Sequence, residues 1–113
     1  MATLFTKIIR REIPAKIVYE NDKVLAFEDI NPQAPHHVLI IPKVEIPTIN
    51  DLTPENVHVV GDLFLAARDL AKSWGVAEDG YRVVMNCNAE GGQTVFHLHL
   101  HLLAGREMHW PPG

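Results

Sequence analysis

The chain has 113 residues, of which 47% are hydrophobic and 21% charged, and its net charge is −4 with histidine counted as neutral. This size predicts one domain, residues 1–113, whose core needs no disulfide, and the single cysteine, Cys87, allows none within the chain. The acidic balance argues against a DNA or RNA surface, and no run approaches the ~20 apolar residues of a membrane span. Because no signal peptide is recognisable, we expect a cytoplasmic protein.

Hydrophobic periodicity and turn residues divide the chain into short elements. Apolar residues at three- and four-residue spacing indicate helices, and alternating apolar residues bounded by Asn, Pro or Gly indicate strands. Thr3 is a candidate N-cap for the first helix, Thr53-Pro54-Glu55 is a strong start for the second, and Gly75 ends it. In chain order we expect a helix over 3–11, strands over 17–20, 24–29 and 37–41, a helix over 54–74, and strands over 81–86 and 95–103.

These five strands and two helices, joined mostly by hairpin-like links, predict an α+β fold with an antiparallel sheet. Two prolines make residues 29–35 a loop, and Gly91-Gly92 indicates a turn within residues 88–94. The second helix is apolar on more than one side, which suggests that a second subunit covers part of it. The tail, residues 104–113, is expected to be irregular.

The stretch with the clearest chemistry is 95–103, where His97, His99 and His101 alternate with leucines. Strict alternation is the period of a β-strand, so the three imidazoles are expected on one face, roughly 6.6 Å apart, with the leucines in the core. A row of imidazoles suits a phosphate or a metal better than it suits a core.

Three interpretations of this row compete. A surface strand that is histidine-rich by chance is the plainest, but the strict alternation disfavours it. A zinc site is sharper, because neutral imidazole binds Zn²⁺, but residues along one strand do not easily converge on one point. The third interpretation is nucleophilic catalysis on phosphorus, in which one imidazole attacks and a neighbouring histidine supplies a proton.

Donors for a phosphate lie just upstream of the histidines. Asn86, the Gly91-Gly92 amides, Gln93 and Thr94 could face developing charge on phosphate oxygens. This stretch is not a P-loop, because no Gly-Lys-Thr/Ser follows. Asp29 could accept both hydroxyls of a ribose, and either His36 or His37 must face inward by alternation, within reach of the row.

The run His97-Leu98-His99-Leu100-His101-Leu102-Leu103 matches the histidine-triad signature, and the chain resembles the Hint branch of the histidine triad nucleotide-binding family. The resemblance covers nearly the whole chain. It includes the opening residues 5–14, the loop Asp29-Ile30-Asn31-Pro32-Gln33-Ala34-Pro35, and the ending 105–113 with Trp110-Pro111-Pro112-Gly113. Thr94 departs from the pattern, since a serine is common there, as do Asn31 and His36.

The resemblance implies a five-stranded antiparallel sheet continued across a homodimer, and hydrolysis of purine nucleoside 5′-phosphoramidates to the nucleotide and an amine, with no cofactor and no metal. It implies that His99 is the nucleophile, that His101 assists at the phosphate and leaving amine, and that the His97 carbonyl orients His99. By the same resemblance His37 joins a proton relay, and Trp110 reaches the partner's site. The nucleotide-binding residues that it implies are Asp29 and Ile30 at the ribose, Asn86, Gly92, Gln93 and Thr94 at the phosphate, and Leu4, Phe5, Ile8, Ile13, Phe27 and Leu39 at the base.

Three alternatives stay open from the sequence. The chain could be a nucleotide-binding or interaction module with vestigial hydrolysis, a dinucleoside polyphosphate hydrolase, or a zinc-binding module. The intact triad favours an enzyme over the first, and the Hint-like tail disfavours the second.

Overall fold

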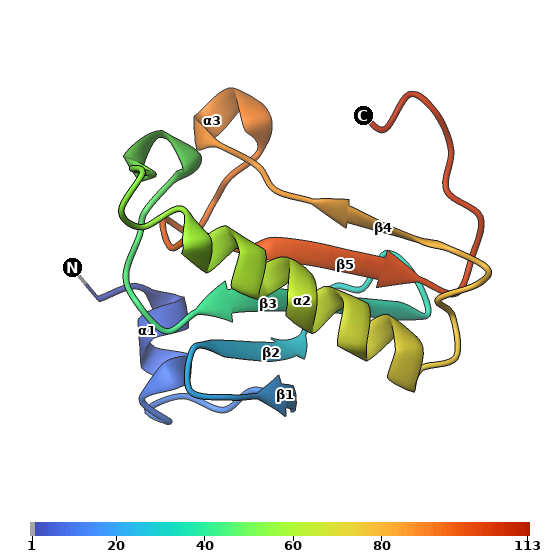
Figure 1. Cartoon of the computed structure of the whole chain (residues 1–113), viewed down its shortest axis with the longest axis horizontal. Helices are drawn as coiled ribbons and strands as arrows, with labels where there is room; N and C mark the ends of the chain where they lie inside the picture. Colours follow the sequence, from blue (N-terminus) through green and yellow to red (C-terminus); the bar gives the residue numbers. More distant parts are fainter. Residues whose placement is uncertain (1) are drawn as a thin grey trace.

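The structure is a computed structural model, and it describes residues 2–113. One five-stranded antiparallel sheet, in the order β1-β2-β3-β5-β4, carries helices on its two faces (Figure 1). The fold is therefore α+β, as the sequence predicts. The elements are α1 (Leu4–Ile9), β1 (Ile17–Glu20), β2 (Val24–Glu28), β3 (His36–Pro42), the 3-10 turn η1 (Ile49–Asp51), α2 (His58–Ser73), β4 (Tyr81–Val84), α3 (Asn88–Gly91) and β5 (Leu100–Ala104).

The two faces of the sheet bury separate sets of side chains. On one face, α2 packs across β2, β3 and β5 (Figure 1), and Leu63 and Leu70 from the helix meet strand residues such as Ile40 and Leu102. On the other face, α1 packs against the side chains that alternate with these, including Phe27 and Leu39. Because side chains alternate across a strand, β2 and β3 each contribute to both clusters.

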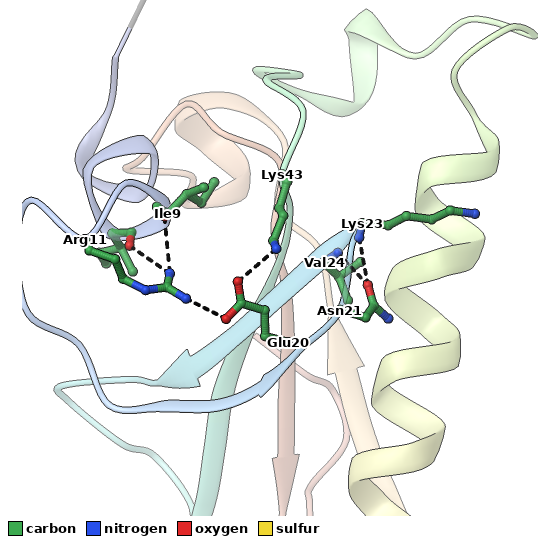
Figure 2. Close-up of polar contacts among 8 residues, drawn as sticks. Ile9, Arg11, Glu20, Asn21, Lys23, Val24 and Lys43 are labelled. Carbon is green, nitrogen blue, oxygen red and sulfur yellow. Dashed lines mark hydrogen bonds and ion pairs between the residues drawn. The ribbon is translucent and has the colours of Figure 1, made fainter.

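Polar contacts at the hairpin end of the sheet fasten α1 to the strands (Figure 2). The side chain of Asn21 accepts hydrogen bonds from the backbone N–H of Lys23 and Val24, at 2.8 and 2.9 Å, which forms the β1–β2 turn. The carboxylate of Glu20 pairs with Lys43 at 2.8 Å, and with Arg11 just after α1. These contacts therefore link the segment after α1 to β1 and to the residue that follows β3.

Several sequence predictions are confirmed. Strands β1, β2 and β3 lie where they were expected, to within a residue at each end. Thr3 caps α1, since its hydroxyl accepts from the Thr6 N–H. Within residues 2–113 no helix has the length and apolarity to span a bilayer.

Two helix predictions need correction. The regular α2 begins at His58, not at residue 54, because Thr53 and Asn56 hydrogen-bond each other in a separate turn just before it. The connection 88–94 was expected to be a turn alone, but it contains the short helix α3. Gly92 ends α3 with a φ of +90°, a left-handed conformation that favours glycine.

The strand expected over 95–103 is also shorter than predicted, since β5 covers only Leu100–Ala104. The β3 register pairs Ile40 with Leu100, so residue 98 would fall opposite Pro42, and proline has no N–H to donate to a ladder. The backbone N–H of Leu98 instead donates to the carbonyl of Ile46, at 2.7 Å. His97 and His99 therefore lie in a bent segment leading into the sheet.

Candidate active site

A cavity of about 860 Å³ opens on the α1 face of the sheet. It brings together residues from α1, β2, β3 and β5 and from the segments that follow β4 and precede β5. Of the residues singled out from the sequence, those that line it are Leu4, Phe5, Ile8, Ile13, Phe27, Asp29, Ile30, Leu39, Asn86, Gly92, Thr94, His99 and His101. The cavity is therefore apolar along α1, β2 and β3, and polar where the histidines, Asn86 and Thr94 meet.

His99 is held in a single orientation by its neighbours. Its Nδ1 lies 2.8 Å from the backbone carbonyl of His97, and its ring packs edge-on against Phe5 with ring centroids 5.0 Å apart. A carbonyl oxygen can only accept, so Nδ1 of His99 carries the proton. The lone pair of Nε2 is then free on a ring that lines the cavity.

His101 belongs to a chain of hydrogen bonds that begins on the backbone. The N–H of Gln33 donates to Nδ1 of His37 at 3.0 Å, and Nε2 of His37 lies 2.9 Å from Nδ1 of His101. Because a backbone N–H can only donate, neutral His37 must carry its proton on Nε2 and donate it to His101. Neutral His101 therefore keeps its own proton on Nε2. His37 and His101 reach each other as diagonal neighbours on β3 and β5.

His97 is buried beneath the cavity lining, with its ring 6.2 Å from that of Phe5. Its Nε2 donates to the carbonyl of Pro42 at 2.8 Å, and its Nδ1 makes no hydrogen bond among the described residues. The ring thus ties the segment before β5 to the end of β3, where its carbonyl meets His99. The three histidines lie on the α1 side of the sheet, since the His97 ring is 6.2 Å from that of Phe5 and the alternating Leu98 lies in the α2 cluster, but only His99 and His101 of the three line the cavity.

All four histidines are held neutral near pH 7. Burial lowers the pKa of His37, His97 and His99. Burial, together with repulsion from His99 and His37, lowers the pKa of His101 to about 4. A neutral imidazole is the nucleophilic form, so the surroundings keep His99 able to attack an electrophile.

Asp29 lies at the junction of the cavity and the histidine chain. Its Oδ1 accepts from the N–H of Asn31 at 2.8 Å, and its Oδ2 lies 3.5 Å from Nε2 of His37. The carboxylate is half-buried and lines the cavity. Ile30, next in the chain, is fully exposed at the rim.

Asn86 and Gly92 are close neighbours on the polar side of the cavity. A Cβ on Gly92 would lie 3.9 Å from Nδ2 of Asn86. Asn86 lies two residues beyond Val84, which pairs with His101, so it continues β4 opposite the region of His99. The two residues therefore offer an amide side chain and a backbone near the histidines.

The prediction that Gln93 surrounds the phosphate is not supported, because its polar groups are already used. Its Nε2 donates to the carbonyls of Pro47 and Val95 at 2.8 and 3.1 Å, and its Oε1 accepts from the N–H of Asn88 at 2.8 Å. Gln93 is buried and does not line the cavity. It holds α3 in place rather than facing a ligand.

Asp29, His37 and His101 each place one possible metal-binding atom within 4.8 Å of the others. The sequence argument against zinc concerned residues along one strand, whereas these three come from different elements. However, the lone pair of Nδ1 on His101 points at the proton on His37. A metal could bind there only by displacing that proton.

Some contributions were not foreseen from the sequence. The backbone of Gln33 fixes the tautomer of His37, and the cavity is also lined by Pro14, Ala15, Lys16, Glu28 and Val95. A backbone N–H has no signature in the residue type, so no sequence signal could have identified it. Trp110 is 83% exposed and does not line the cavity of its own chain.

The chain is similar to known proteins over nearly its whole length. A family model described as the HIT domain matches residues 10–108. The purine nucleoside phosphoramidase of Escherichia coli K12 is 55% identical over 94% of this chain and 89% of its own, and a 14 kDa zinc-binding protein of Zea mays is 52% identical over 98% and 88%. The crystal structure of a HIT family hydrolase from Legionella pneumophila superposes with a TM-score of 0.96 at 52% identity, covering 99% of this chain and 100% of that one.

Proposed function

The chain belongs to the HIT domain family, and on this premise we propose that it hydrolyses purine nucleoside 5′-phosphoramidates, such as adenosine 5′-phosphoramidate, to the nucleotide and an amine. The coarser description, a HIT family hydrolase, follows from the relatives themselves. One observation carries the finer proposal. The hydrogen bonds of His99 and His101 leave one lining ring with a bare nitrogen and the other with an N–H.

In the proposed first step, Nε2 of His99 attacks phosphorus and the P–N bond breaks. The nitrogen of the leaving amine keeps the electron pair and takes a proton supplied by solvent. The N–H of His101 is placed to hydrogen-bond the phosphoryl group or the leaving nitrogen. The product of this step is a nucleotidyl group bonded to Nε2 of His99. The ring keeps its proton on Nδ1 and therefore carries a positive charge.

In the second step, water attacks phosphorus and the bond to Nε2 of His99 breaks. The hydroxyl of the water goes to phosphorus and its proton returns to solvent, which replaces the proton that left with the amine, so the enzyme returns to its starting state. Throughout both steps the carbonyl of His97 holds Nδ1–H of His99. It also stabilises the positive charge that this imidazole gains when Nε2 bonds phosphorus.

The remaining lining divides between the ends of a nucleotide. Phe5 and Phe27, whose ring centroids are 5.4 Å apart, offer an apolar wall for a purine. Asp29 offers carboxylate oxygens to the ribose hydroxyls. Asn86 and Thr94 offer donors to the phosphate, and neutral His101 adds its N–H.

We also propose a homodimer in which the sheet continues through β4. Strand β4 is at an edge of the sheet, and an unpaired edge is a template for another strand. Apolar side chains are exposed on α2 and β4, among them Phe64 at 46%, Leu65 at 50% and Tyr81 at 40%. Sedimentation is expected to give a dimer, and Phe64→Asp to shift it towards monomer. A wild-type monomer at micromolar concentration would contradict this arrangement.

Zinc binding is the second candidate, supported by the Asp29, His37 and His101 cluster. Under this alternative the purified protein would carry stoichiometric metal, and a chelator would remove that metal. Under the proposed hydrolysis, turnover would continue in the chelator.

The test is a comparison of substrates in the presence of chelator. Adenosine 5′-phosphoramidate is expected to be cleaved to AMP, and a diadenosine polyphosphate much more slowly. His99→Ala should lower turnover by at least about a thousandfold while the protein stays folded. His58→Ala, an exposed histidine on α2, serves as the matched control and should keep wild-type turnover.

Three results would contradict the proposal. Faster cleavage of the polyphosphate would favour the dinucleoside polyphosphate hydrolase. AMP binding without any hydrolysis would favour the vestigial binding module. Wild-type turnover by His99→Ala would remove the nucleophile assignment.

A further inference from the structure

The histidine chain is anchored by a loop with few other restraints. Residues 29–35 leave β2 and return to β3, and Gln33 lies in their middle, where its N–H donates to Nδ1 of His37. The other bonds within this loop are local, from the N–H of Asn31 to Asp29 and from the side chain of Gln33 to the carbonyl of Asn31. Asp29, at the start of the loop, is attached to β3 because its N–H donates to the carbonyl of His37 at 3.0 Å, but the two local bonds do not attach the middle of the loop to the rest of the fold.

The C-terminal tail attaches the middle of the loop. Nε of Arg106 donates to the carbonyl of Gln33 at 2.9 Å, and Nη1 of the same guanidinium donates to the carbonyl of Glu107 at 2.9 Å. Just before it, Gly105 crosses Pro35 so closely that a Cβ there would lie 2.9 Å from the proline side chain. With a φ of +97°, Gly105 lets the chain turn from β5 over the loop.

We propose that Arg106 is a positioning residue, which holds the 29–35 loop so that the N–H of Gln33 selects the tautomer of His37 and thereby keeps a proton on Nε2 of His101. This inference rests on the proposed hydrolysis for its meaning in catalysis, but its physical content is the tautomer itself. Residues 106, 33, 37 and 101 thus form one chain of hydrogen bonds from the tail to the cavity.

The opposite tautomer shows why the selection matters. If His37 carried its proton on Nδ1, its bare Nε2 would instead accept a hydrogen bond from Nδ1 of His101. The proton of His101 would then lie on Nδ1 and not on Nε2. The ring of His101 would then present a lone pair to the phosphoryl oxygens in place of a donor. Asp29, with Oδ2 3.5 Å from Nε2 of His37, favours the productive tautomer as well, so loss of Arg106 should shift the tautomer ratio partially.

The test compares three variants with wild type. Arg106→Ala removes the bond to the loop, and Arg106→Lys keeps a donor in its place. Arg68→Ala is the control, because Arg68 is an exposed arginine on α2 that pairs with Asp69. The tautomer of His37 is read from the ring ¹⁵N chemical shifts of the free protein, with the signal assigned through His37→Asn. Turnover of adenosine 5′-phosphoramidate is measured separately.

In wild type and Arg68→Ala we expect a single His37 tautomer with the proton on Nε2. In Arg106→Ala we expect a mixture of tautomers and a kcat/KM lower by about two- to tenfold, the range for one lost hydrogen bond. Arg106→Lys should recover part of both.

A single unchanged tautomer in Arg106→Ala would overturn the inference, whether or not activity falls, because a fall alone would place the role of Arg106 elsewhere in the tail. The ring ¹⁵N shifts need no substrate. If wild type fails to hydrolyse the phosphoramidate but Arg106→Ala still mixes the tautomers, the proposed function fails and the positioning role stands.

Discussion

Lowering the pH from 7 to 5 should destabilise the protein through its buried histidines. The pKa of His101 is lowered from 6.5 to about 4 in the folded state, so between these values the unfolded chain binds a proton that the folded chain does not. Stability is therefore complete above 6.5 and decreases as the pH falls towards 4. For His101 alone, the decrease between pH 7 and pH 5 amounts to about 2 kcal/mol.

The window from pH 7 to pH 5 isolates the histidines. The carboxyls of Glu20 and Glu45 have pKa values lowered from 4.5, so these two groups titrate below this pH window. His37, His97 and His99, whose pKa values are also lowered, add to the decrease in the same direction. The total loss should therefore exceed that from His101 alone.

The measurement is urea denaturation of wild type and His101→Asn at pH 7, 6 and 5. The variant has no imidazole at this position. The decrease in its free energy of unfolding from pH 7 to pH 5 should therefore be smaller than that of wild type by about 2 kcal/mol. His58→Asn, at an exposed site on α2, should follow wild type. Parallel curves for wild type and His101→Asn would show that His101 is not held neutral by its surroundings.

Two further substitutions test the framework around the site. Leu102→Ala, at a fully buried position in the α2 core, should cost about 2–5 kcal/mol in the free energy of unfolding, whereas Val44→Ala, at a 54% exposed side chain, should change it by under about 0.5 kcal/mol. Gln93→Ala removes three hydrogen bonds that hold α3 and should lower both the thermal midpoint and kcat/KM. Unchanged values for Gln93→Ala would mean that α3 is held by other contacts.

The sequence predicted most elements because local signals and tertiary packing agree in them. The Asn21 turn, the prolines of the 29–35 loop and the alternation of leucines in β5 all lie where those signals place them. The strand over 95–103 was overestimated because alternation reports which side faces the core, and Leu98 does lie in the α2 core. Alternation does not report whether a partner strand is available, and β3 ends at Pro42.

The site was predictable as a set of residue types but not as a network. Alternation and nearby donors identified His99, His101 and Asn86 as candidate site residues. The family resemblance supplied distinct roles for the histidines. The tautomers depend on backbone groups of Gln33, His97 and Pro42, which residue identity does not reveal. Gln93 was misassigned for a related reason, because a glutamine beside a glycine pair looks the same whether it binds a ligand or braces a helix.

The most direct test of the proposed mechanism is to trap the covalent intermediate. Adenosine 5′-phosphoramidate labelled at phosphorus is mixed with wild-type protein, the reaction is quenched within a turnover, and the label is located by peptide mapping. The mechanism predicts an acid-labile, base-stable label on His99, and none on the His99→Ala protein. Turnover with no label on His99 under these conditions, or a label on His101 instead, would contradict it.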